Sequence, residues 1–173
     1  MNIELIPAAS SDRPTLENLL QLYIHDFSEH WAGTPNGELD STGRFAAYPL
    51  DPYWLDPTCQ PLLIHVDQHL AGFALLNAHS HVGETIDHNV AEFFIVRKHR
   101  RSGVGRRVIH RVFDQHPGEW EIAVARRNVA ALAFWRSAVR SHLQAQRIEE
   151  RDVQSPHWNG PLLRFRIDAQ YST

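Results

Sequence analysis

The chain has 173 residues and a mass of 19.9 kDa, of which 43% are hydrophobic and 21% are charged residues. This composition excludes a disordered chain, and the length suits one domain, residues 1–173, with its own core. No apolar run approaches the roughly 20 residues that cross a bilayer, and the N-terminus lacks the apolar core of an export signal. A single cysteine, Cys59, excludes an internal disulfide. We therefore expect a cytoplasmic protein without a membrane partner.

The net charge of −3 divides unevenly along the sequence. Residues 1–96 contain thirteen acidic and two basic residues, a net of −11, whereas residues 97–173 contain seven acidic and fifteen basic residues, a net of +8. Seven of the positive charges lie between Arg97 and Arg111. The first half suits a cationic ligand and the second an anionic one. The alternative is that both halves form ordinary solvated surfaces.

The first third of the chain predicts a strand, a helix and a long irregular stretch. Ile3 and Leu5 alternate with polar residues as in a strand, and Asp12 and Pro14 suit the start of a helix with apolar residues at helical spacing. Residues 31–58 are rich in Gly, Pro, Asp and aromatic residues. A loop of this length in a compact domain is usually functional or partly helical.

The rest of the chain predicts a hairpin, two strand–helix units and a closing pair of strands. The expected strands cover residues 62–66, 70–78, 90–97, 120–125, 145–150 and 163–167, and the expected helices cover residues 103–113 and 128–139. Helices alternate with strands in this order, which predicts a single α/β or α+β domain.

The most informative segment is the turn between the strand at 90–97 and the helix at 103–113. It is basic and contains Gly103 and Gly105. The first amides of a helix have no internal partner and lie at the positive end of its dipole, so they bind anions, and glycine lets a phosphate approach the backbone. The dinucleotide fingerprint is excluded because Val108 stands where it needs a third glycine, and the P-loop because no Gly-Lys-Ser/Thr is present. We predict a phosphate-binding loop.

Two motifs resemble those of the GCN5-related N-acetyltransferase (GNAT) superfamily. The segment Arg100-Arg101-Ser102-Gly103-Val104-Gly105 is similar to the family's Arg/Gln-x-x-Gly-x-Gly/Ala turn. The segment Asn128-Val129-Ala130-Ala131-Leu132-Ala133-Phe134-Trp135 is similar to its Asn-x-x-Ala-x-x-Phe/Leu-Tyr helix. The resemblance covers about residues 61–140. It implies a mixed, largely antiparallel twisted sheet flanked by helices, with two splayed central strands that form an acyl-CoA cleft.

The resemblance also implies an activity, an acetyl-CoA-dependent N-acetyltransferase in which a primary amine attacks directly within a ternary complex. Acetyl-CoA would be the co-substrate, its pantetheine arm on backbone groups near residue 95 and its pyrophosphate on the glycine turn. The expected partner is a small-molecule amine. The cofactor-binding residues that this implies are Ile95, Val96, Arg97, Arg100, Arg101, Ser102, Gly103, Val104, Gly105, Arg106, Asn128 and Trp135.

For the catalytic base we predict Glu92. It lies in an apolar run, where a carboxylate is costly unless it is used or paired, just before the pantetheine-binding residues. The alternatives are a salt-bridged or strand-edge glutamate at this position, and Glu84, Asp87, His88 or a water molecule as the base. The family's usual oxyanion donor is a backbone amide near Ile95.

The chain departs from the family at Trp135, where the family often has a tyrosine that protonates the leaving thiolate. Indole does not donate a useful proton, but a thiol has a pKa of about 8.5, so solvent can protonate it without a dedicated acid. We expect Trp135 to pack against the pantetheine arm or the sulfur.

The irregular stretch at 31–58 would form a wall of the family's acceptor site. Here we predict that Asp51, Tyr53 and Trp54 bind the acceptor, because aromatic and acidic side chains together suit a cation. The acceptor would then be a small cationic amine. The alternative is aromatic packing of a lid over the core.

Two other functions remain open from the sequence: a non-catalytic acyl-CoA-binding sensor or interaction domain, and a nucleic-acid-binding module that uses the basic segment Arg97–Arg111. The pI near 6.4 and the glycine placement argue against nucleic acid. A metal site at His79, His81 and His88 is not expected, because no carboxylate or cysteine is placed to complete it. The oligomeric state is open, with a homodimer among the alternatives.

Overall fold

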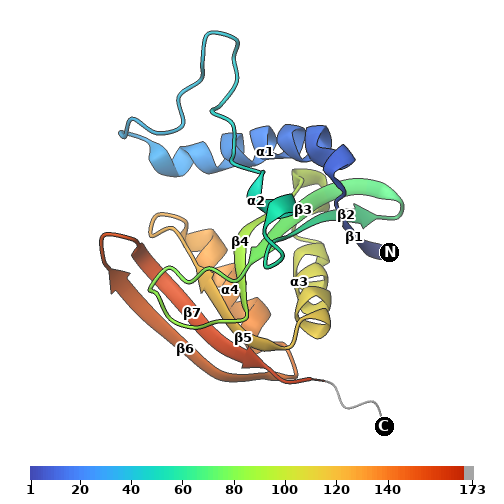
Figure 1. The fold of residues 1–173 in the computed structure, drawn as a ribbon, viewed down its shortest axis with the longest axis vertical. Coiled ribbons are helices and arrows are strands. Elements are labelled where there is room, and N and C mark those ends of the chain that lie inside the picture. Colours follow the sequence, from blue (N-terminus) through green and yellow to red (C-terminus); the bar gives the residue numbers. More distant parts are fainter. Residues whose placement is uncertain (170–173) are drawn as a thin grey trace.

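Residues 1–169, which the computed structural model describes, form one seven-stranded sheet in the order β1-β2-β3-β4-β5-β7-β6 (Figure 1). Neighbouring strands are antiparallel except β4 and β5, which run parallel. The strands are β1 (Ile3–Pro7), β2 (Gln60–Val66), β3 (His69–Asn77), β4 (His88–Ile95), β5 (Gly118–Ala123), β6 (Ala145–Gln154) and β7 (Asn159–Ile167). The α-helices are α1 (Arg13–Phe27), α2 (Pro52–Leu55), α3 (Val104–Gln115) and α4 (Val129–Arg140). The predicted mixed, largely antiparallel sheet with flanking helices is confirmed.

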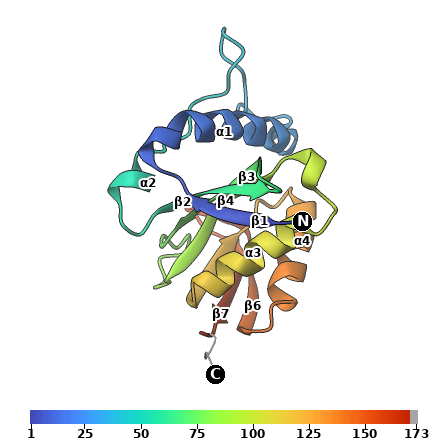
Figure 2. The ribbon, with the colours of Figure 1, turned by 90° about the vertical axis from the view of Figure 1, so that its right-hand side faces the viewer.

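Helices cover both faces of the sheet (Figure 2). Along β2, Leu62 and Ile64 belong to the apolar cluster that contains α3 and α4, whereas Leu63 belongs to the cluster that contains α1 and α2. Successive side chains of a strand point to opposite faces, so this run of buried residues serves two cores. It explains why β2 and β3 read as continuous apolar runs in the sequence.

The two central strands separate soon after they meet. The β4–β5 ladder consists of His88 with Trp120 and Asn89 with Glu121. In β4, Glu92 pairs with Leu75 and Val90 with Leu76, so Ala91 is an extra residue in a bulge. A bulge bends and twists its strand. Beyond Asn89, β4 and β5 therefore diverge, as predicted, and leave an opening in the sheet.

Most predicted elements are present with shifted ends. The strand expected at 90–97 ends at Ile95, because residues Arg97–His99 form a 3-10 turn. The stretch at 31–58 contains one short helix, α2. Asp12 precedes α1, but its carboxylate accepts a hydrogen bond from the Ala9 amide (2.9 Å) instead of capping a helix amide. No helix within residues 1–169 is long and apolar enough to cross a membrane.

Candidate active site

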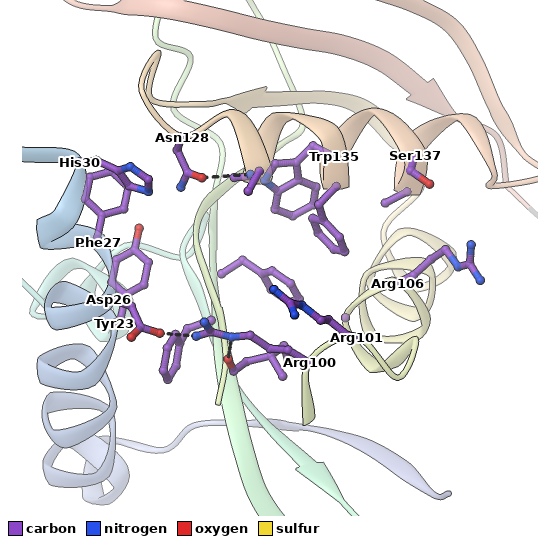
Figure 3. Close-up of a pocket in the computed structure, with 18 of the residues that line it drawn as sticks. Tyr23, Asp26, Phe27, His30, Arg100, Arg101, Arg106, Asn128, Trp135 and Ser137 are labelled. Carbon is purple, nitrogen blue, oxygen red and sulfur yellow. Dashed lines mark hydrogen bonds and ion pairs between the residues drawn. The ribbon is translucent and has the colours of Figure 1, made fainter. Parts of the chain in front are cut away.

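A cleft of about 790 Å³ lies where β4 and β5 diverge (Figure 3). Its walls come from the C-terminal half of α1, the end of β4, the turn before α3, and α4. Figure 3 shows Tyr23 and Asp26 on the α1 side and Trp135 on the α4 side, with β4 between them. The two walls of the cleft thus differ in chemistry: the α1 wall carries polar groups and the α4 wall an aromatic ring.

The turn before α3 has the geometry of an anion site. Arg101 and Gly103 both adopt a left-handed backbone, with φ of 60° and 81°. The first intrahelical hydrogen bond runs from the Arg107 amide to the Gly103 carbonyl (3.1 Å), so the amides of residues 104–106 precede it. Such amides, at the positive end of the helix dipole, bind phosphate. A Cβ at Gly103 would meet no atom within 4 Å, so glycine is needed there for conformation and not for space.

Gly105 has a different reason to be glycine. A Cβ there would lie 3.3 Å from Cε2 of Phe134 and 3.8 Å from Cε1 of Phe93. The Phe93 and Phe134 rings stack at 5.8 Å between centroids, and Trp135 packs 5.4 Å from Phe93. These three rings form an aromatic wall of the cleft. Gly105 therefore keeps the helix start close to this wall without filling the space beside it.

The backbone of β4 offers fewer groups to a ligand than the sequence suggested. The Val96 amide donates to the Ala71 carbonyl (2.8 Å), and the Val96 carbonyl accepts from the His99 amide (3.0 Å). The Arg97 carbonyl accepts from the Arg100 amide (3.1 Å). These predicted pantetheine contacts at Val96 and Arg97 are thus already used by the fold. Alternate residues of a strand point their backbone groups to opposite sides, so those of Ile95 face the cleft, where Arg100 Nε occupies the carbonyl at 2.6 Å.

Two predicted phosphate ligands are held by an acid on α1. The Asp26 carboxylate accepts from Arg97 Nη2 (2.7 Å) and from Arg100 Nη2 (2.5 Å). Burial opposes its charge, but the hydrogen bonds from Arg97 and Arg100 outweigh this and hold the pKa of Asp26 below its usual value. Arg97 and Arg100 therefore tie the loop to α1, while Arg101 and Arg106 line the cleft and remain the cations placed for phosphates.

Three other predicted cofactor residues have structural contacts. Ser102 Oγ donates to the His99 carbonyl (2.9 Å) and closes the turn. Val104 is buried in the core. The Asn128 side chain accepts from the Ala131 amide (3.0 Å) and so caps α4, while also lining the cleft. Trp135 is 7% exposed and lies in the aromatic wall, next to Phe134.

The predicted base, Glu92, is half-buried and bonded to tyrosines. The Tyr23 hydroxyl donates to Glu92 Oε2 at 2.5 Å, and Tyr48 also hydrogen-bonds the carboxylate. Burial raises the pKa of Glu92, although the bonds from Tyr23 and Tyr48 oppose the shift. Burial also raises the pKa of Tyr53 to about 12, and Tyr53 contacts Tyr48. A carboxylate whose pKa is raised in this way suits proton transfer near neutrality.

The three predicted acceptor residues do not lie together in one site. Tyr53 is buried and joins the cluster around Glu92. Asp51 instead pairs with Arg13 Nη1 (2.5 Å), and Trp54 Nε1 donates to the Ala8 carbonyl (3.0 Å). Arg13 lies over the Trp54 ring at 5.9 Å, so Asp51 and Trp54 anchor α2 to the start of α1, away from the residues that line the cleft.

The alternative bases and the proposed metal ligands are dispersed. Glu84 pairs with Arg151 and Arg164, Asp87 accepts from the Glu119 amide (2.8 Å), and His88 packs against Trp120. His79 pairs with Asp56 (3.4 Å), whereas His81 bonds Glu121 (3.0 Å). Within the described residues 1–169, His, Cys, Asp and Glu side chains form no group of three that could hold a metal ion.

Sequence reasoning missed Tyr23 and Glu121, and it grouped Tyr48 with the aromatic residues of the 31–58 stretch without linking it to Glu92. Tyr23 lies on the helical stripe of α1 with core residues, and Tyr48 lies in an irregular stretch without periodicity. Glu121 alternates with apolar residues in β5, a pattern that predicts a solvent-facing side chain, yet it is fully buried. The one signal that could have identified Glu121 is its position among apolar residues, the same signal that singled out Glu92.

Several solved structures resemble this one. An acetyltransferase from Thermus thermophilus has 16% sequence identity and a TM-score of 0.63, covering 95% of this chain and 96% of that chain. Aminoglycoside acetyltransferase AAC(6')-Ib in complex with coenzyme A has 13% identity and a TM-score of 0.63, with 96% and 95% covered. A chimera of the spermidine N-acetyltransferase SpeG from Vibrio cholerae has 13% identity and a TM-score of 0.56, with 96% and 95% covered.

At these identities the solved structures establish the fold alone. No curated protein matches the chain in sequence. Residues 16–138 match the family described as Acetyltransferase (GNAT) family. This match spans most of the chain and includes the glycine turn before α3, the splayed strands and most of α4. The chain therefore belongs to the acetyltransferase (GNAT) family.

Proposed function

We propose that this acetyltransferase transfers the acetyl group of acetyl-CoA to a primary amine of a small cationic molecule, by direct attack in a ternary complex. The observation that carries this proposal is a helix start with anion-site geometry at a cleft whose wall residue Tyr23 hydrogen-bonds Glu92. The structural neighbours named for aminoglycosides and spermidine support a cationic acceptor as a class. The two predicted acceptor residues that anchor α2 to the start of α1, Asp51 and Trp54, have no part in it.

The cleft fits coenzyme A in its shape and its donors. The amides of residues 104–106, with Arg101 and Arg106, would hold the pyrophosphate, and the aromatic wall of Phe93, Phe134 and Trp135 would pack on the pantetheine arm. The bound thioester supplies an activated carbonyl. The Ile95 amide faces the cleft and would donate to that carbonyl oxygen as negative charge develops on it.

Burial and position support Glu92 as the base. Its raised pKa makes it a better proton acceptor than an exposed carboxylate. Tyr23 holds one carboxylate oxygen and also lines the cleft. Once the amine has attacked, Glu92 takes a proton from the nitrogen. Holding both substrates side by side supplies much of the remaining acceleration.

The test is coenzyme A release from acetyl-CoA with a panel of primary amines, followed by Glu92→Gln with the best acceptor. Glu92→Gln should lower kcat by about 10²-fold or more at neutral pH, and alkaline pH should restore part of it by deprotonating the free amine. Glu119→Gln is the matched control, because it removes a carboxylate of β5 that pairs with Arg166 outside the cleft. Normal turnover by Glu92→Gln would assign the base to another residue or to water.

A non-catalytic acyl-CoA-binding domain is the second candidate, and the observation that favours it is Trp135 in place of tyrosine. Coenzyme A release above the background rate with any amine would exclude it. Nucleic-acid binding is weakened as a candidate because Asp26 already pairs with Arg97 and Arg100 of the basic segment. Steep salt-dependent binding of DNA or RNA, without affinity for coenzyme A, would reverse this order.

A further inference from the structure

Glu121 is a fully buried carboxylate at the point where the sheet opens. It is the last residue of β5 that pairs with β4, and its side chain has 0% exposure. Oε1 accepts from the His81 amide (2.7 Å) and contacts His81 Nδ1 (3.0 Å), while Oε2 accepts from Ser80 Oγ (2.7 Å). Burial opposes its charge, but the bonds from His81 and Ser80 outweigh this and hold the pKa of Glu121 below its usual value. Glu121 is therefore an anion with both oxygens engaged, and it acts only through its partners.

The main partner is the His81 imidazole. An anionic carboxylate at Nδ1 requires a proton on that nitrogen, which leaves the lone pair of the neutral ring on Nε2. The ring packs edge-on to Trp158 at 4.8 Å, and 27% of the His81 side chain is exposed. His81 also interacts electrostatically with Glu92, so it lies near the proposed base. His81 thus offers a held proton acceptor with access to solvent.

Charged groups surround the His81–Glu121 pair. Glu121 on β5 and Glu92 on β4 are carboxylates that interact with His81. Arg164 on β7 lies 3.6 Å from Glu121 Oε2, but its guanidinium also pairs with Glu84 (2.8 Å). Glu84 pairs in turn with Arg151 (2.6 Å). The Arg164 guanidinium is thus shared between two carboxylates.

The reaction in the proposed function needs two proton acceptors. An ammonium acceptor must lose one proton before its nitrogen has a lone pair for attack, and the adduct loses a second as the amide forms. The C–N bond forms, the C–S bond breaks, and the thiolate leaves with the electron pair. One proton ends on the thiolate sulfur and the other in solvent. Glu92 holds one proton at a time, so a second group with access to solvent can carry the first proton away before the amine attacks.

We infer that His81, held by Glu121, takes the first proton from the incoming ammonium and releases it to solvent. The ammonium N–H bond breaks and an Nε2–H bond forms, after which Glu92 is free to take the second proton. His81 is then a catalytic residue and Glu121 a positioning residue. This inference rests on the proposed function.

The test compares ethylamine, which is an ammonium ion at pH 7, with 2,2,2-trifluoroethylamine, which is largely neutral there. For His81→Gln, kcat/KM with ethylamine should fall by about 10²-fold, whereas with trifluoroethylamine it should change by less than about threefold. The loss with ethylamine should shrink tenfold for each unit of added pH, because the free amine becomes more abundant. His79→Gln is the matched control: it removes an exposed histidine two residues away that pairs with Asp56, and it should behave as the wild type with both amines.

Glu121→Gln tests the positioning role: kcat/KM with ethylamine should fall while that with trifluoroethylamine changes by less than about threefold, and Glu121→Asp, which keeps the carboxylate, should restore part of the loss. If Glu121→Gln fails to fold, His81→Gln remains decisive because its ring is partly exposed. Equal losses with both amines, or no loss with ethylamine, would overturn the inference. No coenzyme A release by the wild type with any primary amine would remove the proposed function itself, a distinct result.

Discussion

Gly105→Glu tests whether the start of α3 holds the pyrophosphate. The new side chain would leave the backbone toward Phe134 and Phe93, into the cleft, and would carry a negative charge to the helix amides that are proposed to bind phosphate. Like charges at this distance repel, and the carboxylate can itself occupy the free amides. Both effects act on the bound state, so coenzyme A affinity should fall.

The size of the effect on folding can be worked from Gly105→Ala. Alanine is favoured over glycine in a helix by about 1 kcal/mol. Its Cβ would lie 3.3 Å from Phe134 Cε2, so the ring must move by a few tenths of an ångström, which offsets part of the gain. The free energy of unfolding of Gly105→Ala should therefore stay within about 1 kcal/mol of the wild-type value, which shows that the position tolerates a side chain. A loss of affinity in Gly105→Glu then reports on binding and not on a damaged fold.

Calorimetric titration with coenzyme A and denaturant unfolding give the two quantities. For Gly105→Glu we expect at least a tenfold loss of affinity, about 1.4 kcal/mol, with an unchanged circular dichroism spectrum. Gly43→Ala is the control: its φ of 78° makes alanine strained by about 1 kcal/mol, its Cβ would meet no atom within 4 Å, and Gly43 does not line the cleft. It should lose stability and keep its affinity within a few fold. A folded Gly105→Glu that binds coenzyme A as the wild type does would refute the site.

Two further variants examine the two walls of the cleft. Tyr23→Phe removes the hydrogen bond that lowers the pKa of Glu92, so that pKa should rise further and the acidic limb of the kcat profile should move to higher pH; an unmoved profile would separate Tyr23 from the base. Trp135→Phe should weaken coenzyme A binding while leaving the pH dependence of kcat in place, because indole donates no proton to the thiolate; a large loss of kcat with unchanged affinity would contradict this.

The parts of the fold that the sequence predicted are those set by neighbours along the chain. The helical stripe of α3, with Val104, Val108 and Val112 buried, and the hairpin of β2 and β3 follow from apolar periodicity. The turn was predictable because Gly103 needs a left-handed backbone and Gly105 has little room for a side chain beside Phe134. Both requirements act within a few residues, so a local motif records them.

The contacts around Glu92 and Glu121 could not be predicted from local patterns. Tyr23 and Glu92 are separated by 69 residues, and His81 and Glu121 by 40. No local pattern marks such partners, because each side chain alone fits an ordinary helix or strand. Asp51 shows the converse, since it lies beside Tyr53 in sequence yet pairs with Arg13. The composition of residues 31–58 indicated an acidic and aromatic segment near the site. The conformation of α2 determines that Tyr53 approaches Glu92 whereas Asp51 pairs with Arg13.

The charge division along the chain has a structural outcome that bears on acceptor recognition. Acids of the first half pair with bases of the second: Asp26 holds Arg97 and Arg100, and Glu84 holds Arg151 and Arg164. Two of the thirteen acids of the first half are thus paired across the fold. The proposed recognition of a cationic amine also needs groups in contact with it. Two carboxylates lie near the opening of the sheet, where β4 and β5 diverge. Glu92 is hydrogen-bonded by Tyr23, and Glu121 is bonded to His81. The same divergence thus lies beside both the proposed cofactor cleft and the proposed proton acceptors.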